Sequence, residues 1–395
     1  MLPALNFAPT TSLSTGISSL DIAAPTVTSQ ASIFEDTFLE ETANRLKQGT
    51  DSGAGAGATN AITDSATTAS NSYSSVIEHG IDYQNLDWSM LFEESCLILT
   101  LAVILEMIIP LSRKFKLDGL MGIFGALGRK VNRSGDSASQ RSFAGIALPV
   151  LIIAVFMFLV ITLYYFSNRD GIVALVIMFL ILELKFPQDR AILVYRALHE
   201  GFKDKAKDLL QSMVLRQTSM LSSMGIAKAA SESAILRIFS GWFAVMVWYY
   251  LWGVEGAVLM QLINVLERTY NYKLRGNHQF GRMLFHLQQI MLVIPALLLM
   301  LCLVCSKNPM RHFVTAAAGF KAYPAPISGL VLGAVGGSLN IALGGPRYYQ
   351  GYIMRLPQVG GTYSPDEQSI LYAMRKIRMC GIILLVLSIV IGLNV

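Results

Sequence analysis

The chain has 395 residues, of which 53% are hydrophobic and only 14% are charged, and this composition excludes an ordinary soluble protein. Its net charge of +5 is unevenly spread, because residues 1–90 hold ten acidic and two basic residues and are strongly acidic. The remaining chain is correspondingly basic. Basic loops beside apolar runs are typical topology signals of membrane proteins, so no nucleic-acid partner is predicted.

Residues 1–90 are rich in Ser, Thr, Ala and Gly and contain the low-complexity run 53–57. Such a segment buries too little apolar surface to offset the entropy of ordering, which predicts a disordered acidic tail. It lacks a basic start followed by an apolar core and is therefore not interpreted as a signal peptide.

Residues 91–395 form the predicted membrane domain. Several apolar runs approach the ~20 residues that a helix needs to cross a bilayer, and backbone groups in lipid must be satisfied within the helix. We therefore predict an all-α polytopic membrane protein with about five to six spans. The runs are residues 91–111, 143–166, 171–182, 242–263, 283–304 and 379–395.

Charge sets the predicted orientation. Residues 112–142 carry seven Lys or Arg and two Asp, which predicts that this loop of a multi-pass membrane protein is cytoplasmic. Two further basic segments, residues 183–239 and 306–378, are predicted soluble cytoplasmic insertions. Within the first of them, residues 188–213 follow the pattern of an amphipathic helix.

Two acidic residues lie inside apolar runs. Glu106 is expected to face the bundle interior or a polar cavity, and Glu255 is the one charged residue of residues 242–263. Strict alternation of spans puts the link 264–282 outside, which fits poorly with its charged and polar residues. The alternative is that residues 242–263 lie partly in the interface or re-enter, and both interpretations stay open.

Gly344-Gly345-Pro346, followed by Arg347, predicts a turn that brings backbone close to a ligand, with an arginine for an anion. The competing interpretation is a turn that ends a helix. No Gly-Lys-Ser or Gly-Lys-Thr occurs, which excludes a P-loop. Cys302 and Cys305 have metal-type spacing without a partner pair, so they are interpreted as small buried hydrophobic residues.

Several short motifs follow one another along the chain in an order that is more informative than any one of them. They are Leu215-Arg-Gln-Thr218, Ile226-Ala-Lys-Ala229 with Glu232, Gly241, Trp248, Gly256-Ala257, Asn264 with Leu266, Tyr272, Phe280-Gly281, Pro295-Ala296, Pro324-Ala-Pro-Ile-Ser-Gly329 and Leu343-Gly-Gly-Pro346 with Tyr349. This order resembles the CobD/CbiB family, the adenosylcobinamide-phosphate synthases of cobalamin biosynthesis. The resemblance covers residues 91–395 and is strongest over 196–351.

The resemblance implies a multi-pass enzyme of the bacterial inner membrane. This enzyme would use ATP and Mg²⁺ to join a carboxylate of adenosylcobyric acid, a corrinoid, to the amine of aminopropanol or its phosphate. The resemblance also implies catalytic roles for Arg216, Thr218, Glu232 and Glu267. The substrate-binding residues that it implies are Asn264, Tyr272, Ser328, Gly329, Gly344, Gly345, Pro346, Arg347 and Tyr349. A homo-oligomer is left open.

The chain departs from the family pattern at most of its acidic motifs. The Arg-Asp-Thr motif reads Arg216-Gln217-Thr218, the Glu-Asn motif reads Leu236-Arg237, and the Asp after it reads Ser240. The Asp of Asn-Thr-Leu-Asp becomes Glu267, and the Asp-Asp pair reads Gln288-Gln289. Glutamine keeps the size of a carboxylate side chain but lacks the negative charge that Mg²⁺ requires.

Two functions are therefore weighed. The first is an amide synthase that has diverged, and the second is a non-catalytic membrane scaffold that binds a corrinoid or acts in regulation, as AmpE does. AmpE lacks the Pro-x-Pro-x-Ser-Gly and Gly-Gly-Pro motifs that this chain keeps. A transporter is disfavoured because no repeat symmetry is evident.

Overall fold

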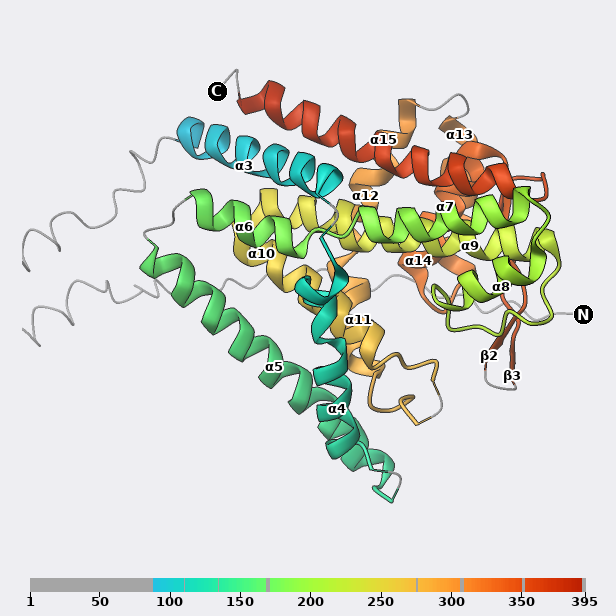
Figure 1. Ribbon diagram of the computed structural model, residues 1–395, viewed down its shortest axis with the longest axis horizontal. Helices are drawn as coiled ribbons and strands as arrows, with labels where there is room; N and C mark the ends of the chain where they lie inside the picture. Colours follow the sequence, from blue (N-terminus) through green and yellow to red (C-terminus); the bar gives the residue numbers. More distant parts are fainter. Residues whose placement is uncertain are drawn as a thin grey trace, which may run out of the picture. The chain divides into compact units, whose positions relative to one another are not determined.

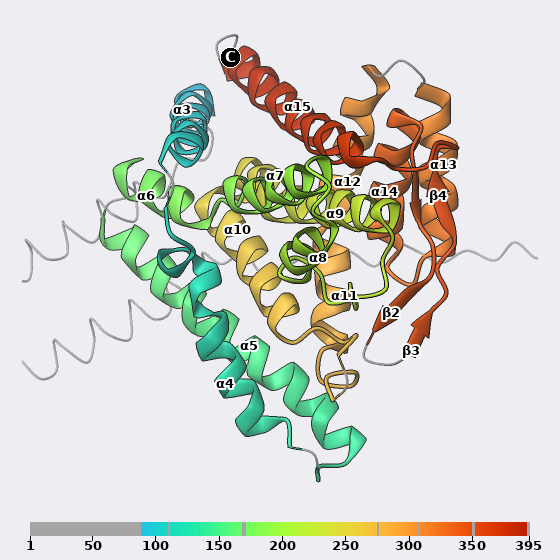
Figure 2. The same cartoon turned by 45° about the vertical axis from the view of Figure 1, so that its right-hand side comes forward.

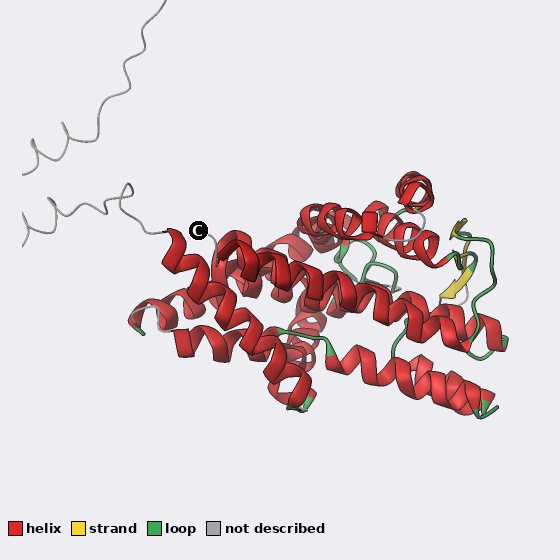
Figure 3. Ribbon diagram, turned by 90° about the horizontal axis from the view of Figure 1, so that it is seen from above, coloured by secondary structure: helices red, strands yellow, loops and turns green. Residues whose placement is uncertain are grey.

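The computed structural model describes residues 88–109, 111–133, 135–167, 171–274, 276–305, 309–349 and 352–392. The tail predicted to be disordered, residues 1–90, lies almost wholly outside these ranges. The described chain is mostly helical, as predicted, and its short strands gather at one end (Figure 3). The helices are α3 (Trp88–Ile108), α4 (Met121–Val131), α5 (Ala138–Phe166), α6 (Gly171–Ile181), α7 (Lys185–His199), α8 (Lys203–Gln211), α9 (Ser223–Ile238), α10 (Ala244–Thr269), α11 (Arg282–Met291), α12 (Val293–Cys302), α13 (Pro309–Ala322), α14 (Pro326–Leu339) and α15 (Glu367–Gly392).

Three helical stretches of the described chain are long and apolar enough to cross a membrane. They are Ala138–Phe166, Gly171–His199 and Ser223–Thr269, and a fourth results if the pair α11 and α12, bent by 40°, counts as one span. The membrane-helix architecture is thus confirmed, whereas the predicted five to six spans are only partly confirmed. The first predicted run forms α3, whose part Ser95–Ile108 is shorter than a full span.

The apolar run 242–263 folds back on itself within α10. Trp252 and Gly253 have non-helical backbone angles, and Gly253 adopts φ 65° and ψ −157°, a region open essentially to glycine alone. Asn264 Nδ2 then donates to the carbonyl of Ser240 at 2.7 Å. A straight helix would separate these residues by about 36 Å, so α10 is a helical hairpin.

This hairpin settles which of the two interpretations of the link 264–282 the structure supports. Because the second arm of α10 returns to the level of Ser240, the link lies on the same side as α9. Asn132 Nδ2, from the basic loop before α5, donates to the carbonyl of Gly276 in the link at 3.0 Å. The chain reversal therefore supports re-entry over strict alternation of spans.

Long-range packing brings the soluble and apolar parts together. Helices α7, α9 and α15 lie side by side and pack against one another (Figure 1). Helices α13 and α14 form a close hairpin in which a Cβ on Gly333 would lie 2.2 Å from the carbonyl oxygen of Thr315. Small residues permit this approach, as in other membrane helix pairs.

The amphipathic segment 188–213 is two helices rather than one. Helix α7 ends before Gly201, which has φ 81°, and α8 begins at Lys203. The sequence analysis also did not predict strands β1 (Ala342–Gly344), β2 (Arg347–Tyr349), β3 (Tyr352–Met354) and β4 (Gln358–Gly360). Strand β1 pairs antiparallel with β4 and β2 with β3, and β4 packs beside α13 and α14 (Figure 2).

Candidate functional site

A buried carboxylate, Glu232 of α9, contacts both the loop before its own helix and the distant segment of strands β1 and β2. Its Oε2 lies 2.9 Å from Arg216 Nη2 and 3.1 Å from Arg347 Nη2. Its Oε1 accepts a hydrogen bond from the backbone N–H of Gly344. Helix α9 therefore positions the loop before it and strands β1 and β2 through a single side chain.

The surroundings of this carboxylate are strongly positive. Burial lowers the pKa of Arg216, against the opposing effect of Glu232. Burial would also lower the pKa of Arg347, but the facing carboxylate outweighs it and raises that pKa. Burial would raise the pKa of Tyr349, yet Lys273 and Arg347 together bring it below its ordinary value. A lowered pKa of a phenol indicates a positive electrostatic potential around it, because the negative phenolate is stabilised.

Two cavities adjoin this cluster. The first, of about 180 Å³, has Arg216, Glu232, Arg347 and Tyr349 in its wall. We call it the arginine pocket. Its remaining lining includes Lys273 and residues of α9, among them Arg237, so three guanidinium groups and one ammonium group share the pocket with one carboxylate.

The second cavity, of about 150 Å³, brings together several of the positions that the sequence analysis compared with the acidic motifs of the family. Its lining includes Ser240, Glu267, Gln288 and Gln289, and also Ser328 from the Pro-x-Pro-x-Ser-Gly motif. We call it the amide pocket. Residues from several of the motifs that carry the resemblance, far apart in the sequence, thus meet in one pocket.

The two pockets are neighbours, because Leu236, Arg237 and Lys273 line both of them. Arg268 also lines the amide pocket. The pair of pockets therefore presents several cations and only two carboxylates, Glu232 and Glu267. Such a lining suits a carboxylate or phosphate group of a ligand.

The residues of the two pockets do not fit Mg²⁺ in the way that the resemblance implied. Glu232 already meets two guanidinium groups, and buried Glu267 accepts from Asn271 Nδ2 at 2.8 Å. No group of three His, Cys, Asp or Glu that could hold a metal occurs in the part of the chain that the structure describes. Magnesium prefers an octahedron of oxygen ligands with carboxylate charge, and this lining is cationic instead.

Two glutamines of the amide pocket, Gln288 and Gln289, form hydrogen bonds between helices. Gln288 Nε2 donates to Asn264 Oδ1 at 3.0 Å, and Gln289 Oε1 accepts from the backbone N–H of Ile327 at 3.1 Å. Their amides therefore join α11 to α10 and to the start of α14. Asn264, predicted to bind substrate, is fully buried in this set of hydrogen bonds.

The predicted site residues divide by position. Arg216, Glu232, Gly344, Arg347 and Tyr349 come together. The backbone N–H groups of both glycines are used internally, since Gly345 donates to Pro357 at 3.1 Å, so these glycines offer none to a ligand. Pro346 is exposed beside them.

Three other predicted residues lie in different surroundings. Thr218 donates to Gln211 Oε1 at 2.9 Å and does not line either pocket. Tyr272 packs on Phe285 with ring centroids 4.4 Å apart. A Cβ on Gly329 would lie 2.3 Å from the carbonyl oxygen of Gly319, so this glycine serves the crossing of α13 and α14.

Sequence reasoning missed a buried ion network at the membrane edge of the amide pocket. Arg268 pairs with Glu183 at 2.8 Å and with Asp118 at 3.0 Å, and Arg237 pairs with Glu183 at 2.9 Å. The signal was available, since Glu183, Arg237 and Arg268 each stand just outside an apolar run. Charges in that position are usually interpreted as solvated ends of spans.

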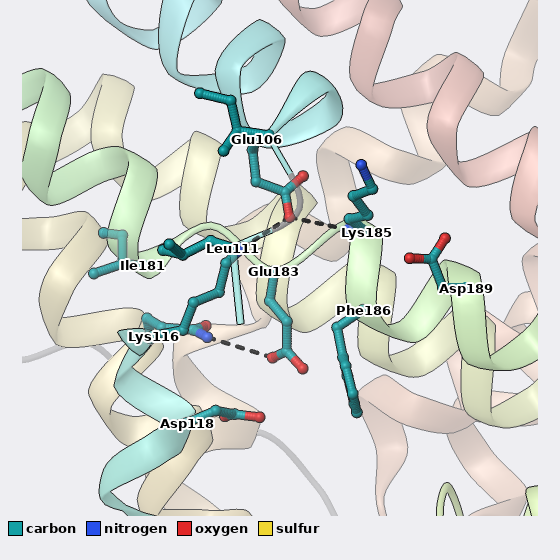
Figure 4. A pocket seen from close by; sticks show the side chains of 11 residues that line it. Glu106, Leu111, Lys116, Asp118, Ile181, Glu183, Lys185, Phe186 and Asp189 are labelled. Atoms are coloured by element: carbon teal, nitrogen blue, oxygen red, sulfur yellow. Dashed lines mark hydrogen bonds and ion pairs between the residues drawn. The ribbon is translucent and has the colours of Figure 1, made fainter. Parts of the chain in front are cut away.

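A small cavity of about 80 Å³ lies beside this network (Figure 4). Glu106 is 1% exposed there, as the prediction that it faces the interior required, and its Oε1 meets Lys116 Nζ at 2.8 Å. Four carboxylates of the cavity and network, Glu106, Asp118, Glu183 and Asp189, are matched by Lys116, Lys185, Arg237 and Arg268. This charge balance favours a structural role.

The fold and the pockets define a helical membrane protein with a cation-lined polar site beside its apolar helices. Comparison with known families is consistent with this class: the family described as CobD/CbiB protein matches residues 99–377. The chain therefore belongs to the CobD/CbiB family.

Individual relatives agree with that assignment. A cobalamin biosynthesis protein CobD of Stutzerimonas stutzeri is 26% identical over 270 residues, which is 65% of this chain and 89% of the relative. The CobD of Chromobacterium violaceum is 26% identical over 290 residues, covering 72% of this chain and 92% of the relative. No solved structure matches the chain.

Proposed function

We propose that this protein is a corrinoid-binding membrane protein of cobalamin metabolism, and that it binds a carboxylate-bearing side chain of the corrinoid in the arginine and amide pockets. The observation that carries the proposal is the joined, cation-rich lining of these pockets. Carboxylate and amide groups, which decorate a corrin ring, are complementary to guanidinium, ammonium and glutamine side chains.

The volumes of the two pockets indicate that only part of a corrinoid would enter them. Cavities of about 180 Å³ and 150 Å³ hold a side chain or a phosphate but not a whole macrocycle. The corrin ring would therefore remain at the pocket mouth while its acid enters. Because the pockets replace the family's acidic residues with glutamine, the proposal does not include ATP-dependent amide formation.

The family's reaction is the second candidate function. It is favoured by the similarity to proteins named CobD over about nine-tenths of their length, and by the intact cluster around Glu232. On this alternative, Glu267 would be the remaining carboxylate of the amide pocket. ATP and Mg²⁺ would then have to be held without the acidic pair that the family supplies.

Binding and catalysis are tested separately. Cobyric acid absorbs visible light, so its binding to the full-length chain in detergent is measurable by difference spectroscopy. We expect saturable binding that weakens about tenfold or more in Arg347→Ala, because a charge-assisted hydrogen bond is lost. Arg355→Ala, at an exposed arginine of the same segment, is the matched control and should bind as the parent does.

Complementation separates the two candidates. A bacterial strain that lacks the amide synthase is supplied with cobyric acid, so that its growth depends on the missing reaction. On the binding proposal, expression of this chain should not restore growth. Rescue that disappears in Glu267→Ala would establish the enzyme instead. Equal binding of cobyric acid by the parent chain and Arg347→Ala would contradict the proposed site.

A further inference from the structure

A third cavity lies at the tip of the α10 hairpin, away from the arginine and amide pockets. Its volume is about 580 Å³, and its walls come from α3, α5 and both arms of α10. The lining that carries the argument is Ser95, Tyr164, Tyr249, Tyr250, Trp252 and Glu255. We call it the tip cavity.

Glu255 gives the tip cavity its charge. It is the one charged residue of the apolar run 242–263, and no ion pair or hydrogen bond involves it among the described residues. None of the described residues that line the cavity is a Lys or an Arg. An ionisable residue within a membrane-inserted segment is costly unless a partner or ligand compensates it, so the site calls for a cation.

The aromatic residues fit the same chemistry. Tyr164, Tyr249, Tyr250 and Trp252 line the cavity together with Glu255. Aromatic faces attract ammonium groups, and such cages combined with a carboxylate recognise organic cations. Tyr250 is fixed by a hydrogen bond between its hydroxyl group and that of Ser388.

The bend of the hairpin holds the carboxylate in place. Gly253 has φ 65°, and a Cβ there would lie 3.1 Å from Glu255 Oε2. The chain reverses at this residue, so Glu255 starts the second arm of α10 and its side chain reaches the cavity. The backbone conformation and the position of the charge therefore depend on the same glycine.

Exposed apolar residues surround the opening of the cavity, as expected of a surface that faces lipid. Three of its lining residues, Ile161, Leu251 and Trp252, are also exposed, by 47%, 54% and 64%. Helix α5, which supplies Ile161, is apolar throughout its span, and only 11% of its apolar window is buried. An occupant would thus enter from the membrane with its acyl chains along this apolar surface.

We propose that the tip cavity binds the ammonium headgroup of a membrane phospholipid of the phosphatidylethanolamine type. The ammonium group would pair with Glu255 and lie against the aromatic residues. The hydroxyl groups of the wall would face the polar part of the headgroup. This site is independent of the function proposed for the arginine and amide pockets.

The test counts lipids on the intact full-length protein by native mass spectrometry after delipidation. Phosphatidylethanolamine and phosphatidylglycerol with the same acyl chains are compared, together with free ethanolamine. We expect phosphatidylethanolamine to bind at least about tenfold more tightly than phosphatidylglycerol, and Glu255→Gln to remove this preference. Glu200→Gln, the same change at an exposed glutamate, should leave it intact.

A second variant guards against misfolding of the first. Trp252→Leu keeps an apolar side chain but removes an aromatic face, and it should weaken the preference for phosphatidylethanolamine several-fold. Equal binding of the two lipids by the parent protein would overturn the proposal. So would a preference that survives in Glu255→Gln, or Glu255-dependent binding of free ethanolamine without any binding of the lipid.

Discussion

At the scale of single residues, Glu232 determines the arginine pocket, because its carboxylate faces two guanidinium groups that belong to segments far apart in the sequence. In Glu232→Gln, Arg216 and Arg347 would face each other without the charge that separates them. Removing one partner of a buried ion pair costs about 3 kcal/mol. We expect a clearly lower denaturation midpoint of the detergent-solubilised protein.

The matched control is Asp204→Asn. Asp204 pairs with Lys207 at 3.0 Å, but its side chain is 92% exposed. An exposed pair contributes about 0.5 kcal/mol or less, so this variant should denature close to the parent. Equal shifts in Glu232→Gln and Asp204→Asn would contradict the claim that the Glu232 cluster is the stabilising one.

Glu106 is a second buried carboxylate that joins elements far apart in the sequence. Its Oε1 accepts from the backbone N–H groups of Leu184 and Lys185 at 3.1 Å and 3.0 Å, so a residue of α3 caps α7. Glu106→Ala would leave these N–H groups without their acceptor and buried Lys116 without its counter-charge, at about 3 kcal/mol. Glu106→Gln keeps an oxygen for the backbone and should lose less. Hydrogen exchange at the start of α7 measures the difference.

At the scale of elements, the reversal in α10 places the functional residues. Gly253→Ala would force a side chain into a backbone region that costs about 1–3 kcal/mol and would crowd Glu255. We expect lower stability together with loss of the lipid preference of the tip cavity. Gly122→Ala is the control, since α4 is helical there and nothing lies within 4 Å of the added Cβ. Comparable losses in both variants would contradict the argument.

The elements also show what the sequence could and could not predict. Apolar runs correctly predicted helices, and the inward position of Glu106 followed from its charge. Whether residues 242–263 re-enter was left open, and the reversal at Gly253 was not predicted, because a single glycine in an apolar run is also compatible with a straight span. Strands of three residues carry too little alternation to be recognised, as β1 to β4 illustrate.

The candidate site was predictable in part for a related reason. The sequence analysis named Arg216, Glu232 and Arg347 separately, and the structure brings them together. The hydrogen bond between Glu232 and Gly344, 112 positions apart, has no local sequence pattern that could have predicted it. Arg237, Arg268 and Lys273 were missed because charges at the ends of apolar runs are typical of solvated boundaries. Only tertiary packing shows that they face a pocket.

At the scale of the whole molecule, the hairpin in α10 fixes sidedness. Single cysteines replacing Ser212 and His278 should both react with a membrane-impermeant maleimide from the side that carries the arginine pocket. Both residues are exposed. A cysteine replacing Tyr165, exposed at the other end of α5, should react from the opposite side. Labelling of residues 212 and 278 from opposite sides would mean that residues 242–263 cross the membrane.

The two ligand sites should act independently, because α9 and the first arm of α10 separate Glu232 from the tip cavity by about 30 Å of helix. Mutations this far apart without shared partners add to within about 0.5 kcal/mol. In a double-mutant cycle of Glu232→Gln and Glu255→Gln, stability changes should therefore sum. Cobyric acid binding should respond to the first change alone, and phosphatidylethanolamine binding to the second alone. A coupling well above this limit would show that the helical hairpin transmits the state of one site to the other.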